Sequence, residues 1–164
     1  MMREYLQDKL IILDNILSSE ECDQLIEYHK TKGHTKKWDW CYQMSIHPGD
    51  TFVVPKINKV VSAINSLLEV KICVDWCEIV RWPRGSKKPP HLDYASDRTV
   101  LASITYLNDD YEGGATFIDN DLKCIPKKGR SFYFDGQYYH HGVEKVRKKD
   151  RYTIAIWYIL DNVS

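Results

Sequence analysis

The first third of the chain alternates between apolar runs and amphipathic stretches. Residues 9–16 (Lys-Leu-Ile-Ile-Leu-Asp-Asn-Ile) are mainly apolar and predict a strand. A helix is predicted immediately after it, because Ser18 precedes Glu21 by three residues, which is the spacing of a capping box. Gly33 stands near the expected end of this helix.

A second helix is predicted over residues 55–69. Its apolar residues recur at helical spacing on one face: Ile57, Val60, Val61, Ile64, Leu67 and Leu68. Pro55 suits a position in the first turn, where no backbone N–H is needed. Between the two helices, residues 38–54 alternate large apolar residues with other residues, which predicts a strand there.

From about residue 72 the pattern changes to short strands separated by turn signals such as Pro83-Arg84-Gly85 and Asp119-Asn120-Asp121. The predicted strands are 72–82, 99–107, 115–118, 122–125, 131–134 and 151–160. Several strands at this spacing indicate a β-sandwich or barrel. We therefore expect a mainly β fold with N-terminal helices (α+β). The chain is read as one domain over 1–164, with a helical support region at 1–71 and a jelly-roll core at 72–160.

Composition narrows the class of protein. Of the 164 residues, 43% are hydrophobic and 28% charged, which is typical of a globular domain. The formal net charge is +0, so no overall field favours nucleic acid or an anionic membrane. The N-terminus lacks a long apolar stretch, and the five cysteines include no CxxC pair. We expect a cytoplasmic protein with reduced thiols and with neither a membrane nor a nucleic acid as its partner.

His91 and Asp93 are the first candidates for chemistry. They follow the predicted strand 72–82 and a turn rich in proline and glycine, and residues i and i+2 of an extended chain project to one side. With a third ligand from a remote strand, they would occupy one face of an octahedral iron(II) site and leave the other face open. A structural zinc site would instead require four ligands.

The third ligand is ambiguous in the sequence. His140 and His141 are adjacent, so they point in opposite directions on an extended backbone, and only one is expected to be a ligand. Periodicity does not choose between them. The His-x-Asp tripeptide by itself also fits a histidine and an aspartate in a surface loop.

Arg151 begins the last predicted strand. Alternation places Arg151, Thr153, Ala155 and Trp157 on one face and Tyr152, Ile154, Ile156 and Tyr158 on the other. A guanidinium beside a hydroxyl and a small side chain would bind a carboxylate in a bidentate manner. On strand 99–107, Tyr106 shares a face with Ala102 and Ile104 and could donate its hydroxyl to the same carboxylate.

The stretch 77–158 resembles the 2-oxoglutarate- and iron(II)-dependent oxygenases, in particular the prolyl 4-hydroxylase-like branch. The matching pieces stand in order: Cys-Glu-Ile-Val-Arg-Trp-Pro-Arg-Gly-Ser, His91-Leu-Asp93, Asp97-Arg98-Thr99, Ser-Ile-Thr-Tyr-Leu-Asn-Asp, Glu112-Gly-Gly-Ala-Thr-Phe, Pro-Lys-Lys-Gly-Arg-Ser-Phe-Tyr-Phe, His141-Gly-Val-Glu-Lys-Val and Arg151-Tyr-Thr-Ile-Ala-Ile-Trp. Many members of that family have tyrosine where Trp82 stands.

The resemblance implies a double-stranded β-helix core of the jelly-roll or cupin-like type. It selects His141 over His140, so that His91, Asp93 and His141 are the catalytic iron ligands. It also implies that Arg151 and Tyr106 bind the distal carboxylate of 2-oxoglutarate.

The implied enzyme is a dioxygenase that uses Fe(II), 2-oxoglutarate and O2 and releases succinate and CO2. A prolyl residue of a peptide or protein is the expected substrate, and ascorbate is a candidate additional cofactor. The alternatives are the same chemistry on a free amino acid or other small molecule, then on a nucleobase, and last a binding module without activity. Residues 34–54 and 82–90 are expected to line the entrance.

Overall fold

The computed structural model describes residues 2–94, 96–119 and 122–162. Its elements are α1 (Met2–Gln7), β1 (Ile11–Leu13), α2 (Ser19–Lys32), β2 (Lys36–Trp38), β3 (Cys41–Ser45), α3 (Val54–Asn65), β4 (Ile72–Trp82), β5 (Lys88–His91), β6 (Thr99–Tyr106), β7 (Glu112–Gly113), β8 (Thr116–Ile118), β9 (Leu122–Cys124), β10 (Ser131–Phe134), β11 (His141–Val143), β12 (Val146–Arg147) and β13 (Arg151–Leu160).

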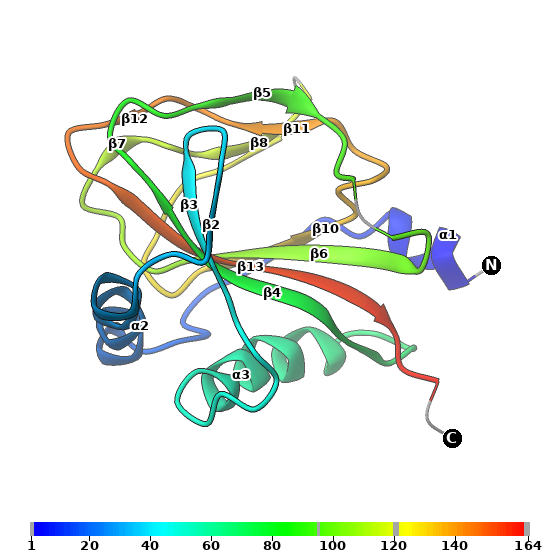
Figure 1. Ribbon diagram of the computed structural model, residues 1–164. Helices are drawn as coiled ribbons and strands as arrows, with labels where there is room; N and C mark the ends of the chain where they lie inside the picture. Colours follow the sequence, from blue (N-terminus) through cyan, green and yellow to red (C-terminus); the bar gives the residue numbers. More distant parts are fainter. Residues whose placement is uncertain (1, 95, 120–121, 163–164) are drawn as a thin grey trace.

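Two antiparallel sheets face each other. The large sheet has the strand order β1-β10-β6-β13-β4-β3-β2, and the smaller one has the order β5-β11-β8-β9. A short pair, β12-β7, lies at one end of the smaller sheet (Figure 1). Helices α2 and α3 lie on the outer side of the large sheet, away from the smaller one (Figure 1). The expectation of a mainly β fold with N-terminal helices is confirmed, and β1, β2 and β3 extend the large sheet at both edges.

Strand β13 lies at the centre of the large sheet, between β6 and β4. Its two faces have the predicted composition. Tyr152, Ile154, Ile156 and Tyr158 belong to the main hydrophobic core, whereas Arg151, Thr153, Ala155 and Trp157 line a cavity between the two sheets. The same strand therefore contributes side chains both to the hydrophobic core and to the cavity.

The main core is formed between the large sheet and helices α2 and α3. Ile57, Val60 and Ile64 of α3 are buried, as the apolar stripe of the sequence predicts. Removing one such isoleucine from water contributes about 1.5–3 kcal/mol to folding. Tyr133 of β10 donates its hydroxyl hydrogen to the carbonyl of Val60 over 2.8 Å, which fixes α3 against the sheet.

Helix α3 ends four residues before the predicted boundary at 69. The side chain of Asn65 accepts from the backbone N–H of Ile72 and donates to the carbonyl of Ile72, each over 2.9 Å. This pair of hydrogen bonds joins the end of the helix to the start of β4, and Leu67 is left 54% exposed. The helical pattern continues in the sequence, but the amide side chain competes with further helix.

The strand predicted within 38–54 is present as β3 but is shorter than that range, and residues 46–53 contain no strand. The hairpin that β3 forms with β2 was not predicted. Asp39 turns the chain at φ 52°, a left-handed conformation that aspartate tolerates better than most residues. Trp38 and Trp40 are both more than half exposed, so their alternation reflects a turn rather than a buried strand face.

The other predicted strands are close to the observed ones. Strands 72–82, 131–134 and 151–160 match β4, β10 and β13 residue for residue. Strand 9–16 shortens to β1, and the short elements α1, β5, β7, β11 and β12 were not predicted. Of the predicted turn at 119–121, residues 120 and 121 lie outside the described residues.

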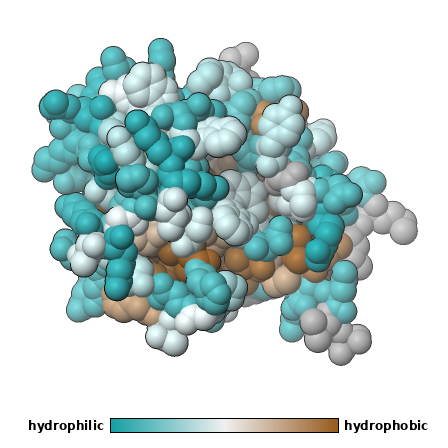
Figure 2. All heavy atoms as spheres, in the orientation of Figure 1, coloured by the Kyte–Doolittle hydropathy of each residue, from teal (hydrophilic) through white to brown (hydrophobic). Residues whose placement is uncertain are grey.

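The surface is mainly polar. Figure 2 shows one face of the molecule on which hydrophilic side chains dominate and hydrophobic ones gather in a band across the lower half. Among the described residues, no helix is long and apolar enough to cross a membrane. All five cysteines are free thiols, and four of them are buried.

The capping box predicted for α2 is present and gives a test of local stability. Ser18 Oγ accepts from the backbone N–H of Glu21 over 3.1 Å, and Glu21 Oε1 accepts from the N–H of Ser18 over 3.0 Å. Ser18→Ala should lower the free energy of unfolding by about 1 kcal/mol. Urea denaturation monitored by circular dichroism measures this change. Ser19→Ala, one position inside the helix, is the control, and an equal loss there would contradict the capping explanation.

Candidate metal centre

The pairing of β5 with β11 brings the three predicted ligands together. His91 and His141 are direct partners in this antiparallel pair. Asp93 follows two residues after His91, and its backbone N–H donates to the carbonyl of Gly136 over 2.8 Å. One ligand atom from each side chain lies within 4.8 Å of the others, and these three residues form a group that could hold a metal ion.

The imidazole rings are oriented by the backbone. Nδ1 of His91 lies 3.0 Å from the carbonyl of Pro89, and Nδ1 of His141 lies 2.9 Å from the carbonyl of Tyr139. A neutral imidazole that donates from Nδ1 presents a lone pair at Nε2. The two Nε2 atoms lie 3.5 and 3.2 Å from Asp93 Oδ1, so three electron donors converge on one point. A set of two imidazoles and one carboxylate suits iron(II) and keeps positions open for other ligands.

The contacts among these side chains also shift the pKa values of Asp93 and His91. Burial by itself would raise the pKa of Asp93, but the hydrogen bonds that His141 and His91 donate when they are protonated at Nε2 outweigh it and hold that pKa well below its usual range. Burial would lower the pKa of His91, but the hydrogen bond with Asp93 outweighs it and raises that pKa. Asp93 is therefore an ionised carboxylate at neutral pH, the form that a cation requires.

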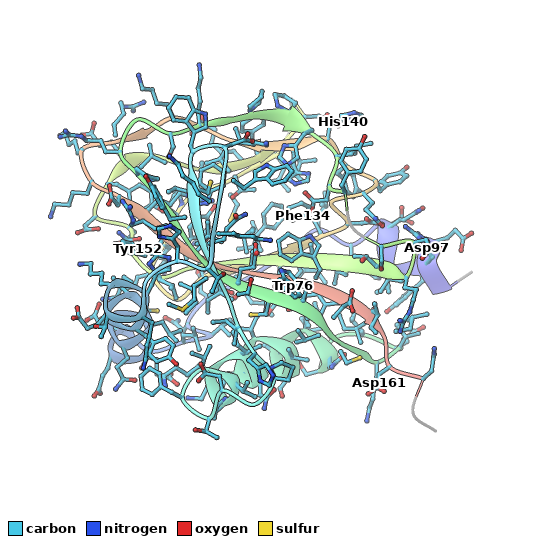
Figure 3. The ribbon with its side chains drawn as sticks, in the orientation of Figure 1. Trp76, Asp97, Phe134, His140, Tyr152 and Asp161 are labelled. Carbon is cyan, nitrogen blue, oxygen red and sulfur yellow. The ribbon has the colours of Figure 1, made fainter. Side chains whose placement is uncertain are left out.

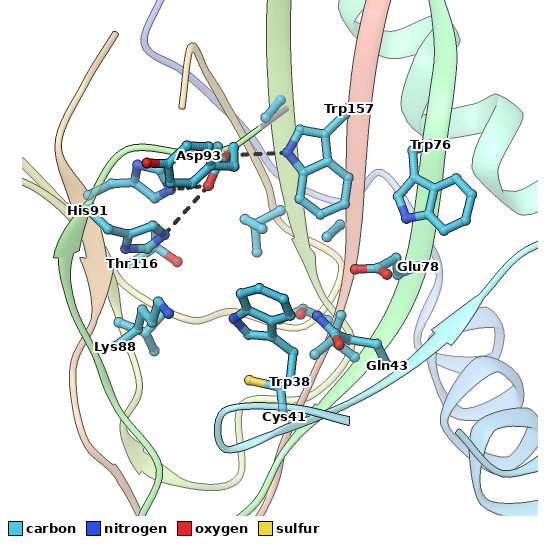
Figure 4. A pocket seen from close by; sticks show the side chains of 18 of the residues that line it. Trp38, Cys41, Gln43, Trp76, Glu78, Lys88, His91, Asp93, Thr116 and Trp157 are labelled. Atoms are coloured by element: carbon cyan, nitrogen blue, oxygen red, sulfur yellow. Dashed lines mark hydrogen bonds and ion pairs between the residues drawn. The ribbon is translucent and has the colours of Figure 1, made fainter. Parts of the chain in front are cut away.

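Two residues of other segments hold Asp93 in place. Trp157 of β13 donates its indole N–H to Asp93 Oδ2 over 3.1 Å, a contact across the cavity between the two sheets (Figure 4). Gly136 lies so close that a β-carbon there would collide with Asp93 Oδ2 and press on the ring of His141. The absence of a side chain at Gly136 thus permits the close approach of two ligands.

The structure decides between the two adjacent histidines. His141 is 6% exposed and packs edge-on against Phe134 with 4.8 Å between ring centroids. His140 is exposed, and Figure 3 shows it at the outer margin of the upper layer, whereas Phe134 lies between the layers. Only His141 joins the cluster with His91 and Asp93.

Arg151 is a buried cation that lines the same cavity. It is 1% exposed, and its guanidinium lies between the rings of Trp82 and Tyr106, at 5.1 and 5.2 Å from their centroids. Nε donates to the carbonyl of Gly114 over 2.9 Å, and Nη2 donates to Thr116 Oγ1 over 3.0 Å. No carboxylate of the described residues forms an ion pair with it, so this guanidinium is suited to an anion from outside the chain.

Tyr106 lies against the guanidinium of Arg151. It is fully buried, and its hydroxyl lies 2.8 Å from Thr116 Oγ1 and 3.1 Å from the carbonyl of Cys124. Thr116 lines the cavity, whereas Tyr106 does not. The predicted contact of Tyr106 with a bound carboxylate stays a prediction, and Thr116 is the polar group that the sequence analysis missed. Its hydroxyl accepts from Arg151 across the two sheets, since β8 belongs to the smaller sheet and β13 to the large one.

The cavity that contains both positions has a volume of about 710 Å³. It is bounded by the two sheets and by the β2–β3 hairpin (Figure 4). The predicted entrance segments contribute Lys36, Trp38, Asp39, Trp40, Cys41 and Gln43, together with Trp82 and Lys88. Residues 44–54 do not line it.

Comparison with known proteins relates this arrangement to one superfamily. Residues 77–159 match the family described as the 2OG-Fe(II) oxygenase superfamily. Human prolyl 3-hydroxylase 2 is 35% identical over an alignment of 82 residues, and the match covers 46% of this chain and 11% of that protein. The chain thus matches only about a tenth of the length of this curated relative.

Solved structures share the fold over almost the whole chain. The viral collagen prolyl hydroxylase of Paramecium Bursaria Chlorella virus-1 superposes with a TM-score of 0.77 at 23% identity, covering 96% of this chain and 99% of that one. A Trichoplax adhaerens prolyl hydroxylase, solved with a hypoxia-inducible-factor peptide fragment, gives a TM-score of 0.72 at 18% identity, covering 97% and 87%. At this identity the similarity shows the fold, the double-stranded β-helix that the sequence resemblance implied.

The hydrogen bond between Trp157 and Asp93 can be tested without turnover. Trp157→Phe keeps an aromatic ring and removes the donor, so the affinity for Mn(II) should fall by about tenfold or more. Anaerobic isothermal titration calorimetry measures this affinity. Trp38→Phe, on the cavity rim, is the matched control and should leave the affinity unchanged. Equal affinities for the wild type and Trp157→Phe would show that the indole N–H does not position the ligand.

Proposed function

Because the chain belongs to the 2OG-Fe(II) oxygenase superfamily, we propose that it hydroxylates prolyl residues of a peptide or protein. The reaction consumes 2-oxoglutarate and O2 and releases succinate and CO2. The observation that carries the proposal is that one cavity contains both the three-residue cluster and a buried arginine with no carboxylate partner among the described residues.

His91, Asp93 and His141 would hold the iron as its catalytic ligands. Their donor atoms fit it, since two imidazole nitrogens and a carboxylate oxygen converge and the cluster opens into the cavity. When bound, iron(II) supplies the activation of O2 that couples decarboxylation of 2-oxoglutarate to insertion of an oxygen atom into a C–H bond. The chain itself orients the ligands, through Trp157 on Asp93 and backbone carbonyls on both histidines.

Arg151 would bind the distal carboxylate of 2-oxoglutarate, with Thr116 as a second donor. The rings of Trp82 and Tyr106 on either side of the guanidinium exclude water, which strengthens its interaction with an anion. Tyr106 would act on the same carboxylate chiefly by orienting the hydroxyl of Thr116.

A peptide substrate is favoured by the cavity rim. Trp38, Trp40 and Tyr94 line the cavity and are exposed. Exposed aromatic rings provide flat apolar surfaces on which proline-rich segments pack. The relatives support this choice, since prolyl hydroxylases are among the proteins with similar sequence and fold, one of them solved with a peptide. Ascorbate is kept as a candidate cofactor, and no residue is assigned to it.

The metal and co-substrate assignment has a spectroscopic test. Addition of Fe(II) and 2-oxoglutarate under nitrogen should produce a visible charge-transfer absorption, and Asp93→Ala should abolish it because one ligand is removed. Asp97→Ala, an exposed aspartate nearby, is the control and should retain the absorption. Absence of the absorption in the wild type would refute the assignment.

The substrate is tested by mass spectrometry. Capped proline-containing peptides should gain the mass of one oxygen atom in proportion to the succinate formed, with product analysis separating 3-hydroxyproline from 4-hydroxyproline. Reactions without ascorbate test its requirement. Reaction of free amino acids alone would contradict the peptide substrate, and succinate without any hydroxylated product would contradict the proposed hydroxylation of these peptides.

The role of Arg151 has a kinetic test. Arg151→Gln should raise the KM for 2-oxoglutarate by about a hundredfold, because a buried charge-assisted contact with the carboxylate is lost. Thr116→Val, which removes the second donor and keeps the shape of the side chain, should raise it by less. The control is Arg147→Gln at an exposed position. Unchanged KM values in folded Arg151→Gln and Thr116→Val would exclude the assigned site.

A further inference from the structure

Two buried acceptors on the large sheet make no well-oriented hydrogen bond among the described residues, although one of them faces the ammonium of Lys36. They are Glu78 Oε2 and Gln43 Oε1, and both side chains line the cavity. Glu78 is 2% exposed. In the pairing of β3 with β4, Gln43 stands opposite Val80, two residues from Glu78, so both side chains are on the cavity face. Figure 4 shows Glu78 across the cavity from His91 and Thr116.

A buried carboxylate is stabilised by a cation, and among the described residues the ion pair of Glu78 comes from the margin of the cavity. Lys36 Nζ lies 3.0 Å from Glu78 Oε2, but the Lys36 side chain is 48% exposed and comes from the edge strand β2. The same ammonium lies 5.4 Å from the centroid of the Trp76 ring. Lys36 therefore shows which chemistry this position accepts: a primary ammonium between a carboxylate and an aromatic face.

This position faces the cluster of His91, Asp93 and His141 across the cavity, and β13 connects the two. Trp157, which donates to Asp93, pairs with Trp76, and Ala155 pairs with Glu78. Along β13, Trp157, which contacts Asp93, is therefore only two residues from Ala155, which lies beside Glu78. A substrate whose reacting carbon lies at the cluster reaches Glu78 with a neighbouring group.

We propose that Glu78, together with Gln43 and Trp76, forms a subsite for a primary ammonium group of the substrate, which displaces Lys36. An ammonium has three donors, so it satisfies Glu78 Oε2 and Gln43 Oε1 together while it lies against the Trp76 ring. The inference rests on the proposed function and gives its substrate class: peptides with a lysine beside the hydroxylated residue. Binding of the α-ammonium of a free amino acid is the alternative that the experiment distinguishes.

The experiment compares capped peptides that contain proline next to lysine or next to norleucine, which has the same stem without the charge. With the wild type, kcat/KM should be about tenfold higher for the lysine peptide. Glu78→Gln should reduce this preference to about onefold. Glu112→Gln, which breaks an exposed ion pair with Lys148 away from the cavity, is the matched control and should keep the preference.

Lys36→Met separates a binding role from a structural ion pair. If Glu78 binds the substrate, Lys36→Met removes a competitor and lowers the KM of the lysine peptide, whereas Glu78→Gln raises it. If the pair only stabilises the fold, both variants break the same contact and shift KM in the same direction, which overturns the proposal. Free lysine and free norleucine, which both carry a primary α-ammonium, test that group, and a preference for them that depends on Glu78 assigns the subsite to that source.

Peptide binding distinguishes failure of the subsite from failure of the proposed function. Isothermal titration calorimetry with the two capped peptides and the two free amino acids requires no turnover. Binding of the lysine peptide or of a free amino acid that depends on Glu78, without succinate formation, supports the subsite and refutes the proposed reaction. Turnover with no dependence on Glu78 for either the peptides or the free amino acids refutes the subsite and leaves the reaction in place.

Discussion

The antiparallel pairing of β5 with β11 is the constraint on which the site depends. It sets His91 directly opposite His141, and the register irregularity between His141 and Val143 follows immediately. Backbone carbonyls then fix both rings, so that Nε2 of each faces Asp93. Convergence of three donors is costly for a folded chain, because each must be desolvated and oriented. The sheet supplies this order before any ligand binds.

The large sheet completes the site through its central strand β13. Its core face holds the large sheet on α2 and α3, and its cavity face carries Arg151 and Trp157. The indole N–H of Trp157 reaches Asp93, so the two sheets are joined at the cluster itself. Packing of the helices against one face therefore positions groups on the other, since a shift of one residue would exchange the two faces.

The cavity contains two charged positions of opposite sign. Arg151 is a buried cation suited to a carboxylate, and Glu78 is a buried anion suited to an ammonium. Each is covered by aromatic rings, Trp82 and Tyr106 for the arginine and Trp76 for the position of the Lys36 ammonium beside the glutamate. Such an arrangement discriminates between ligands by charge, because an incorrect ligand leaves a buried charge unpaired.

Local interactions explain what the sequence by itself determined. The capping box of α2, the faces of β13 and the boundaries of β4 and β10 depend on residues a few positions apart, so their patterns are legible in the chain. The His-x-Asp pair also lies within three residues, and resemblance to a known family added His141 and Arg151. Within 38–54 the strand was expected, but its hairpin with β2 was not, because the backbone conformation of Asp39, not hydropathy, decides that turn.

Only the tertiary structure decided which distant groups meet. Periodicity left His140 and His141 equal, and the pairing with β5 buries His141 in the cluster. Thr116 on Arg151, Trp157 on Asp93 and Glu78 beside Gln43 join residues 35 to 64 positions apart, as the separations of these contacts show. Sheet register and side-chain packing determine such contacts, and neither leaves a periodic trace in a single sequence.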